Sequence, residues 1–265
     1  MKILVLGNSD TAGVFSGGKT WSAIVADGLA ERRDEPVELH EIGFSVLGPT
    51  AAPYAERKVR ELEPELVILP VGTFAFTIGF VWKRVERLFG KRAGRRYKRL
   101  EDRFDASTRG RGTLRDGINR AGRATVRRLL GTQPLGTQRE VTDGYARVIT
   151  ALARFEDAQV VLVAHAARGK HHHRRGALAR RAVFLADVER AAQAHHFTWV
   201  NGDEAYADQA DVDVKTRDGF HQNEMGHRLL GEHIVATMFA AQMARNELAP
   251  VRDPLKPRTG GSRQP

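Results

Sequence analysis

Two short stretches, one near each end of the chain, contain residue types that could carry out nucleophilic catalysis. Ser9 follows a short apolar run, residues 2–6, that is typical of a buried parallel strand ending in a functional loop. A serine there can attack an acyl carbon when a base takes its proton. Asp218 and His221 supply a carboxylate and an imidazole near the other end. Taken alone, Ser9 is better explained as a turn or helix N-cap serine.

Together the two stretches resemble the SGNH hydrolases, also called GDSL esterases and lipases. Gly7-Asn8-Ser9-Asp10 stands where that family usually has Gly-Asp-Ser-Leu, and Asp218-Gly219-Phe220-His221 matches its C-terminal Asp-x-x-His. The resemblance covers residues 1–75 and 140–244. The residues that follow the second stretch also resemble the family's usual continuation: Asn223, Gly226 and His227.

The resemblance implies a serine esterase-type hydrolase with a catalytic triad. Ser9 would attack an oxygen ester, His221 would move the protons, and Asp218 would orient His221. The reaction would be hydrolysis, or transfer, of an acyl group on a small-molecule or carbohydrate ester. It would require no metal ion and no cofactor.

The oxyanion hole is where the sequence departs from the family pattern. The resemblance implies the amides of Ser9 and of a glycine after the second strand, Gly48 or alternatively Gly43, and an asparagine after the third strand. The third block here is Gly72-Thr73-Phe74, so that Phe74 replaces the asparagine and Thr73 is the candidate substitute. Losing one such donor typically costs about 10² to 10³ in rate.

This departure leaves two interpretations open. Thr73, or a donor from elsewhere, replaces the asparagine in an active enzyme. Alternatively, the chain is a non-catalytic SGNH-like protein that binds an anionic ligand, a membrane surface or a partner through its basic helices.

A third interpretation comes from residues 13–20, Gly-Val-Phe-Ser-Gly-Gly-Lys-Thr, which fit the phosphate-binding P-loop pattern. A P-loop follows its strand directly, whereas Gly13 comes six positions after Gly7, the end of the strand, here. We therefore expect a glycine-rich helix start, with a P-loop phosphotransferase as the less favoured alternative.

The elements that must position these residues alternate between strand and helix. Such alternation predicts a parallel sheet covered on both faces. We expect one α/β domain over residues 1–249, a three-layer α/β/α sandwich with about five parallel strands, which is also the flavodoxin-like fold that the resemblance implies. Residues 250–265 should form a disordered tail. The predicted strands are 2–6, 36–42, 66–69, 160–164 and 197–200, and the predicted helices are 18–33, 51–62, 140–156, 176–194 and 224–244.

The charge of the chain is concentrated in one segment. Of a formal net charge of +10, residues 83–128 contribute +12, from 17 basic and 5 acidic residues. The rest is close to neutral, which favours an enzyme core with a basic insertion over a nucleic-acid-binding fold.

The insertion itself, about residues 80–130, has apolar residues three and four apart. They predict two amphipathic helices with basic outer faces, separated near residues 107–112. Placed after the third strand, these helices would lie over the catalytic edge of the sheet. They could form a lid that selects anionic substrates, bind a membrane surface or polyanion, or simply be a solvated face.

The histidines, the lack of cysteine and the lengths of the apolar runs give the remaining expectations. His165 follows the fourth predicted strand and is expected to be structural, and His171, His172 and His173 are expected in a solvated basic loop rather than at a metal ion. The chain has no cysteine. The first strand begins at residue 2 and no apolar run approaches the roughly 20 residues of a membrane span, so we expect a cytoplasmic protein.

Overall fold

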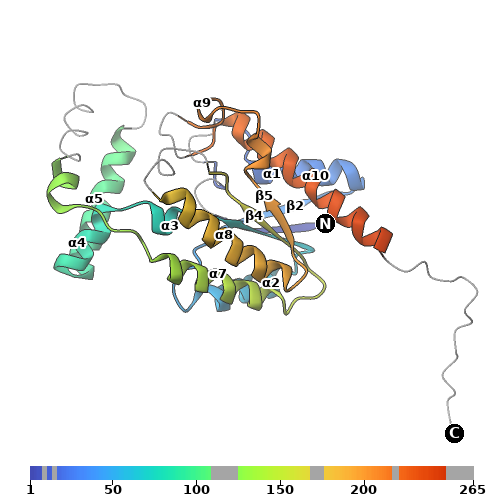
Figure 1. Cartoon of the computed structure of the whole chain (residues 1–265), viewed down its shortest axis with the longest axis horizontal. Coiled ribbons are helices and arrows are strands. Elements are labelled where there is room, and N and C mark those ends of the chain that lie inside the picture. The colour runs from blue at the N-terminus through green and yellow to red at the C-terminus, as the bar shows by residue number, and fades with distance from the viewer. Residues whose placement is uncertain (8–10, 14–16, 109–124, 168–175, 217–220, 249–265) are drawn as a thin grey trace, which may run out of the picture.

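The computed structural model describes residues 1–7, 11–13, 17–108, 125–167, 176–216 and 221–248 (Figure 1). Several predicted features lie outside the described residues: Ser9, Asp218, His171, His172, His173, and the tail at 250–265.

Five parallel strands form the centre of the molecule. Their order is β2-β1-β3-β4-β5, which confirms the predicted α/β fold with about five parallel strands. β1, β3 and β4 are apolar almost throughout because both faces of the sheet are covered, whereas β2 lies at the edge and is more polar. The strands are β1 (Lys2–Gly7), β2 (Glu38–Gly43), β3 (Leu66–Val71), β4 (Gln159–Ala164) and β5 (Thr198–Asn201).

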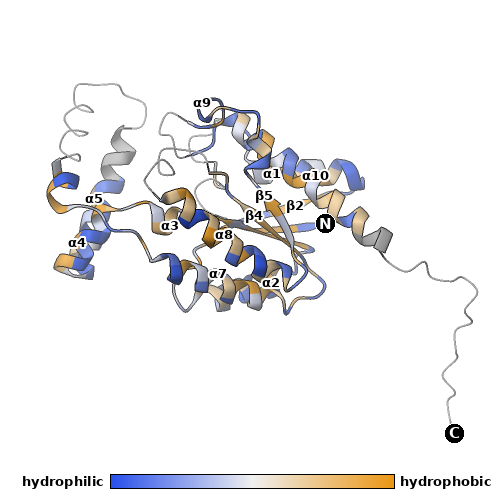
Figure 2. Ribbon diagram, viewed as in Figure 1, coloured by the Kyte–Doolittle hydropathy of each residue, from blue (hydrophilic) through white to orange (hydrophobic). Residues whose placement is uncertain are grey.

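Two layers of helices cover the sheet (Figure 1). Because side chains alternate along a strand, Ile3 and Val5 pack into the core with α1 and α10, and Leu4 and Leu6 pack into the core with α2, α7 and α8. Figure 2 shows largely apolar strands between helices in which hydrophobic and hydrophilic residues alternate. The covering helices are α1 (Trp21–Arg33), α2 (Ala51–Leu62), α7 (Gln138–Leu152), α8 (Ala177–Gln193) and α10 (Glu224–Leu248).

Side-chain caps explain where two of these helices begin. α1 begins at Trp21 rather than at residue 18, because the Thr20 hydroxyl accepts a hydrogen bond from Ala23 N at 3.2 Å. α7 begins after Thr137, which forms a capping box with Glu140. α7 then ends at Leu152, short of the predicted residue 156.

The insertion differs from the prediction. Its first part is not one helix but a hairpin of α4 (Val81–Phe89) and α5 (Lys91–Thr108), because Gly90 adopts a positive φ of 86° and ends α4. Gly94 lets the two helices approach closely, since a Cβ there would lie 2.5 Å from the Cβ of Glu86. Of the second predicted helix, residues 125–130 are helical and 109–124 lie outside the described residues.

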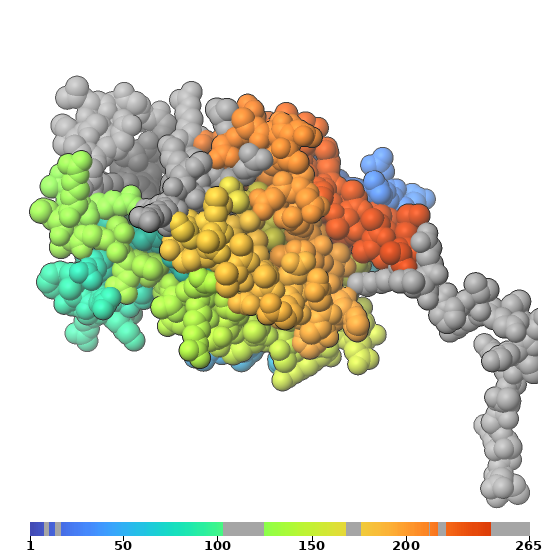
Figure 3. Space-filling view, viewed as in Figure 1, coloured from blue at the N-terminus to red at the C-terminus, as the bar shows by residue number. Residues whose placement is uncertain are grey.

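The hairpin stands outside the three layers, beyond the short helix α3 (Phe74–Thr77) (Figure 1). Its base is joined by a pair of backbone hydrogen bonds between Phe80 and Gln133, at 2.8 and 3.1 Å. In the space-filling view it forms a lobe at one end of the molecule (Figure 3). Within the described part of the chain, no helix is long and apolar enough to cross a membrane.

The packing of α1 against α10 depends on a glycine. A Cβ at Gly231 would lie 2.7 Å from Ile24 Cγ2 and 3.0 Å from the carbonyl oxygen of Trp21. Both contacts are with α1, so a side chain at residue 231 would push the two helices apart.

We therefore expect Gly231→Val to lower the free energy of unfolding by about 1–3 kcal/mol through overpacking. Urea denaturation would measure it. Ala236→Val, at an exposed position of the same helix, is the matched control and should cost less than about 0.5 kcal/mol. Equal losses for the two variants would show that close helix packing is not the cause.

Candidate active site

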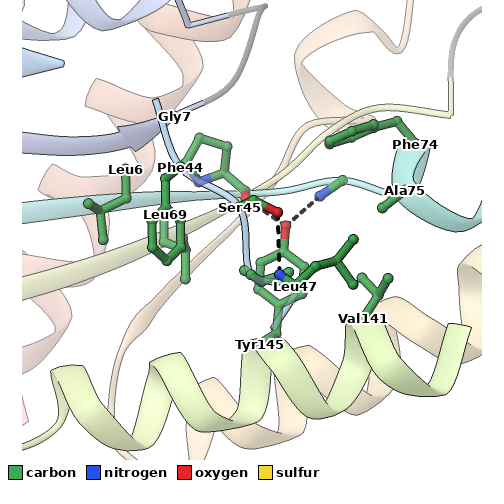
Figure 4. A pocket seen from close by; sticks show the side chains of 13 residues that line it. Leu6, Gly7, Phe44, Ser45, Leu47, Leu69, Phe74, Ala75, Val141 and Tyr145 are labelled. Carbon is green, nitrogen blue, oxygen red and sulfur yellow. Dashed lines mark hydrogen bonds between the residues drawn. The ribbon is translucent and has the colours of Figure 1, made fainter. Parts of the chain in front are cut away.

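The carboxyl ends of β1, β2 and β3 meet at one edge of the sheet, where they line a small pocket (Figure 4). Gly7 ends β1 between its two neighbours and stands two residues before Ser9. It pairs with Gly43 at the end of β2, and its carbonyl accepts a hydrogen bond from Phe44 N at 2.8 Å. This is the edge at which ligands bind in open parallel sheets. The chain therefore enters the segment containing Ser9 directly at this pocket.

Tyr145 of α7 forms the floor of the pocket (Figure 4). Its hydroxyl donates to the Pro70 carbonyl at 2.9 Å and accepts from Gly72 N at 3.2 Å. Burial raises the pKa of the phenol to about 12, although the hydrogen bond from Gly72 N acts in the opposite direction. Sequence reasoning missed this residue because its helical spacing marks it only as a core position.

The Tyr145 hydroxyl holds the backbone on both sides of Val71 and so positions the third block, in which Thr73 and Phe74 follow. Thr73 is buried and does not line the pocket. Its carbonyl accepts hydrogen bonds from Phe76 N and Thr77 N in α3. Phe74, 36% exposed, does line the pocket, so a phenyl ring occupies its rim where the resemblance implies an amide donor.

The two glycines considered for the oxyanion hole lie in different places. Gly43 is paired with Gly7 beside the pocket. Gly48 is exposed, has a φ of 94°, and lines a separate open groove together with Glu140 and Arg147. The segment between the two glycines places Ser45, which the sequence analysis did not consider, in the pocket lining, where its hydroxyl accepts from Leu47 N at 3.3 Å.

His221 lies in a turn that is held tightly before α10. Its carbonyl accepts a hydrogen bond from Thr216 N at 2.9 Å. Asn223 caps α10: its side-chain oxygen accepts from Gly226 N at 2.9 Å, and its amide donates to the Asp213 carbonyl at 2.8 Å. A Cβ at Gly226 would lie 2.3 Å from a backbone oxygen, so only glycine fits there. These contacts hold the backbone carbonyl of His221 and the residues that follow it.

The start of α10 contacts the start of α1, although the two are far apart in sequence. His227 is fully buried, and its Nδ1 accepts a hydrogen bond from Trp21 N at 3.2 Å. A Cβ at Gly18 would lie 2.9 Å from the Glu224 side chain. The end of the β1–α1 loop, at Gly18, thus lies beside the start of α10, three residues after His221.

An ion pair between a buried arginine and a partly exposed aspartate organises the neighbouring edge of the sheet. Arg181 of α8 pairs with Asp203 at 2.8 Å and donates to the His165 carbonyl at 2.7 Å. Asp203 also accepts from Ala167 N at 2.6 Å, so the pair joins the segments after β4 and β5. His165 stands at the carboxyl end of β4, as predicted, and its ring lies against Gly72, where a Cβ would be 3.5 Å away.

Two other kinds of site considered from the sequence, for a phosphate group and for a metal ion, can be compared with the described residues. Lys19 of the P-loop-like stretch forms an exposed ion pair at 2.7 Å with Asp27, a residue of α1. Among the residues that the structure describes, no group of three histidine or acidic side chains could hold a metal ion.

Comparison with known proteins relates the chain to others by fold. No protein-family model matches it, and no curated protein matches it. An α/β hydrolase enzyme from the metagenome of Lake Arreo, Spain, is 15% identical, with a TM-score of 0.53 over 91% of this chain and 95% of that one.

Two solved esterases show the same fold. An acetyl xylan esterase is 18% identical, with a TM-score of 0.51 over 89% of this chain and 98% of its own. An acetylxylan esterase from Geobacillus stearothermophilus is 12% identical, with a TM-score of 0.54 over 89% and 93%. At these identities the likeness is one of fold, and it spans nearly all of the compared chains.

The Tyr145 hydroxyl generates a prediction about stability at high pH. The pKa of the phenol is about 12 in the folded protein and about 10 in the unfolded chain. Between these values the folded state holds the proton and the unfolded state does not, so the free energy of unfolding falls as pH rises. We expect a loss of up to about 3 kcal/mol between pH 10 and pH 12.

Tyr145→Phe should be less stable than the parent at pH 7 by about 1–3 kcal/mol, because it leaves two buried backbone groups without a partner. It should not show the additional loss between pH 10 and pH 12. Urea denaturation of both proteins across this range would test this, because contributions of the other titrating groups cancel. Parallel pH dependence in the two proteins would contradict a buried phenol.

Proposed function

We propose that the protein is a serine hydrolase acting on oxygen esters, with Ser9 as nucleophile, His221 as general base and Asp218 as the group that orients His221. One observation carries the proposal. Contacts between the starts of α1 and α10, above all His227 with Trp21, bring the end of the β1–α1 loop, at Gly18, beside the first residue of α10, three residues after His221. Ser9 and the Asp218-x-x-His221 pattern can form one site only if these two segments lie side by side.

The reaction would follow the usual two steps of acyl transfer. The Ser9 oxygen attacks the ester carbonyl carbon while His221 takes the hydroxyl proton, and the carbonyl electrons move to the oxygen. When the tetrahedral intermediate collapses, His221 gives that proton to the departing alcohol. Water then attacks the acyl-enzyme, again losing a proton to His221, and the acid and free Ser9 are released.

The oxyanion would be held mainly by backbone amides. The amides of Ser9 and Gly48 are the donors that the family pattern assigns, with Thr73 as the third candidate. The pairing of Gly43 with Gly7 supports Gly43 and its neighbours as an alternative to Gly48, because that segment lies at the pocket and Gly48 lines another groove.

The substrate would be a small-molecule or carbohydrate ester. Two structures of the same fold are described as acetylxylan esterases, which supports a short acyl group on a sugar. The pocket is small and largely apolar, with Phe74 and Leu47 at its lining, so it suits a short acyl chain better than a charged group.

Phe74 also supports a second candidate, a non-catalytic protein that uses the same edge for binding. A phenyl ring at the pocket rim cannot donate a hydrogen bond to an oxyanion. An ester-hydrolysis assay separates the two candidates.

The esterase proposal predicts that Ser9→Ala and His221→Ala each lower kcat on a soluble acetyl ester at least about 10⁴-fold while the protein stays folded. A fluorophosphonate should label Ser9 and leave Ser45 unmodified, as peptide mass spectrometry would show. Absence of any adduct on the folded parent, together with no hydrolysis above background, would favour the non-catalytic candidate.

The P-loop alternative generates a separate prediction. Lys19→Ala should leave ester hydrolysis within about twofold of the parent, because Lys19, just before α1, forms only an exposed ion pair with Asp27 of that helix. Titration calorimetry with magnesium-ATP should detect no tight binding. Tight nucleotide binding that Lys19→Ala abolishes would instead establish the phosphotransferase interpretation.

A further inference from the structure

The hairpin of α4 and α5 has an excess of positive charge. Its residues 81–102 are here called the basic hairpin. It carries nine basic and three acidic residues. Only two of the basic side chains form ion pairs within the described part of the chain, Lys83 with Glu86 and Lys98 with Asp102. Six other cations of the exposed surface form no ion pair with an acidic side chain among the described residues: Arg87, Lys91, Arg92, Arg95, Arg96 and Arg99.

The cations gather on one face of α5. Arg92, Arg95, Arg96 and Arg99 are spaced by three and four, so they lie along one side of the helix. Together with Lys98 and Asp102 they line a shallow hollow in which five of the six side chains are cationic. Guanidinium groups arranged in this way match the oxygens of a phosphate group.

Apolar side chains are exposed beside these cations. Leu88 and Phe89, at the tip of the hairpin, are 48% and 65% exposed, and Leu100, four residues after Arg96, is 49% exposed. Val81 and Val85 of α4 are buried, so they form the side of the helix that packs against the protein. Leu88 lies three residues after Val85, on the same side of α4, and is nevertheless about half exposed, so the apolar side of the helix extends into solvent near the cations.

We propose that the basic hairpin binds the surface of a bilayer containing anionic phospholipids. The arginines would contact headgroup phosphates, while Leu88 and Phe89 would enter the boundary between headgroups and acyl chains. The combination of cations with exposed apolar residues is what selects this partner. A bare polyanion offers nothing for Leu88 and Phe89 to contact.

The place of the hairpin in the fold agrees with this partner. It stands beyond α3, outside the three layers, and reaches the body of the protein through the Phe80–Gln133 pair at its base (Figure 1). A projecting lobe can lie flat on a membrane without disturbing the sheet or the pocket. This inference goes beyond the proposed esterase activity and does not depend on it.

The test uses the full chain and sedimentation with sucrose-loaded vesicles, either neutral phosphatidylcholine or a 70:30 mixture with phosphatidylglycerol. We expect binding to the mixed vesicles at least about tenfold stronger than to the neutral ones, and weaker binding as salt shortens the range of the charges below about 8 Å. Replacing Arg95, Arg96 and Arg99 together with glutamine should weaken binding to mixed vesicles at least about tenfold. Phe89→Ser should weaken it severalfold with no change of charge.

The matched control replaces Arg139, Arg190 and Arg228 with glutamine, which removes the same charge from exposed positions on α7, α8 and α10. It should bind vesicles like the parent. Equal losses in both triple variants would overturn the proposal, because general charge would then be responsible. Equal binding of the parent to neutral and mixed vesicles would also overturn it.

Two further outcomes point to other partners and would likewise contradict a bilayer. Binding to single-stranded RNA or heparin that exceeds vesicle binding, with Phe89→Ser behaving as the parent, would indicate a polyanion surface. A raised KM for anionic but not neutral soluble esters in the hairpin triple variant, with unchanged vesicle binding, would indicate a substrate lid. If the protein is not an esterase, only the hydrolysis assay would show it, and the vesicle-binding result would be unaffected.

Discussion

The hydrogen bond from Trp21 N to His227 is the contact on which the arrangement of the site depends. The first amides of a helix have no partner within that helix, so a buried one needs an acceptor from elsewhere. Here the acceptor is His227 Nδ1, which can serve only while that nitrogen carries no proton. The contact spans 206 positions of sequence and ties α10 to the first turn of α1. Because the helices then cross closely at Gly231, the turn before α10 has little freedom to move.

The carboxyl edge of the sheet is held by separate polar contacts rather than by one network. Tyr145 holds the end of β3, Arg181 with Asp203 holds the segments after β4 and β5, and Asn223 holds the turn at His221. Each of these side chains bonds to backbone groups that no strand or helix satisfies. Loops that are fixed in this way can present side chains at defined positions, which is what a catalytic or binding edge requires.

The basic hairpin and the sandwich follow different physical rules. The sandwich is stabilised by two apolar clusters, one on each face of the sheet. The hairpin has a close crossing at Gly94 and a dense positive charge, most of which is unpaired among the described residues. Because the cations of residues 81–102 lie on a lobe that projects from the sandwich (Figure 1), their mutual repulsion does not destabilise the sheet. The pocket at the edge of the sheet and the cationic face of the hairpin can therefore bind different ligands.

By itself, the sequence determined the elements of the core and the type of sheet. Apolar runs such as residues 66–69 mark strands covered on both faces, and strands alternating with helices require parallel pairing. The pattern at 36–42 likewise located β2 within two residues. These features follow from local periodicity, which a single sequence displays directly. The pairing of Ser9 with Asp218 and His221 stays a prediction, because both Ser9 and Asp218 lie outside the described residues.

Only the tertiary structure decided the strand order, the break at Gly90 and the residues that line the pocket. Apolar spacing continues across Gly90, so periodicity alone could not show that a glycine with positive φ turns the chain back there. Tyr145 reads as a core residue until its hydroxyl is seen between Pro70 and Gly72. Gly43 and Gly48 are five residues apart, yet only Gly43 pairs with Gly7. Each of these facts depends on contacts between distant segments, and such contacts leave no repeating signal in the chain.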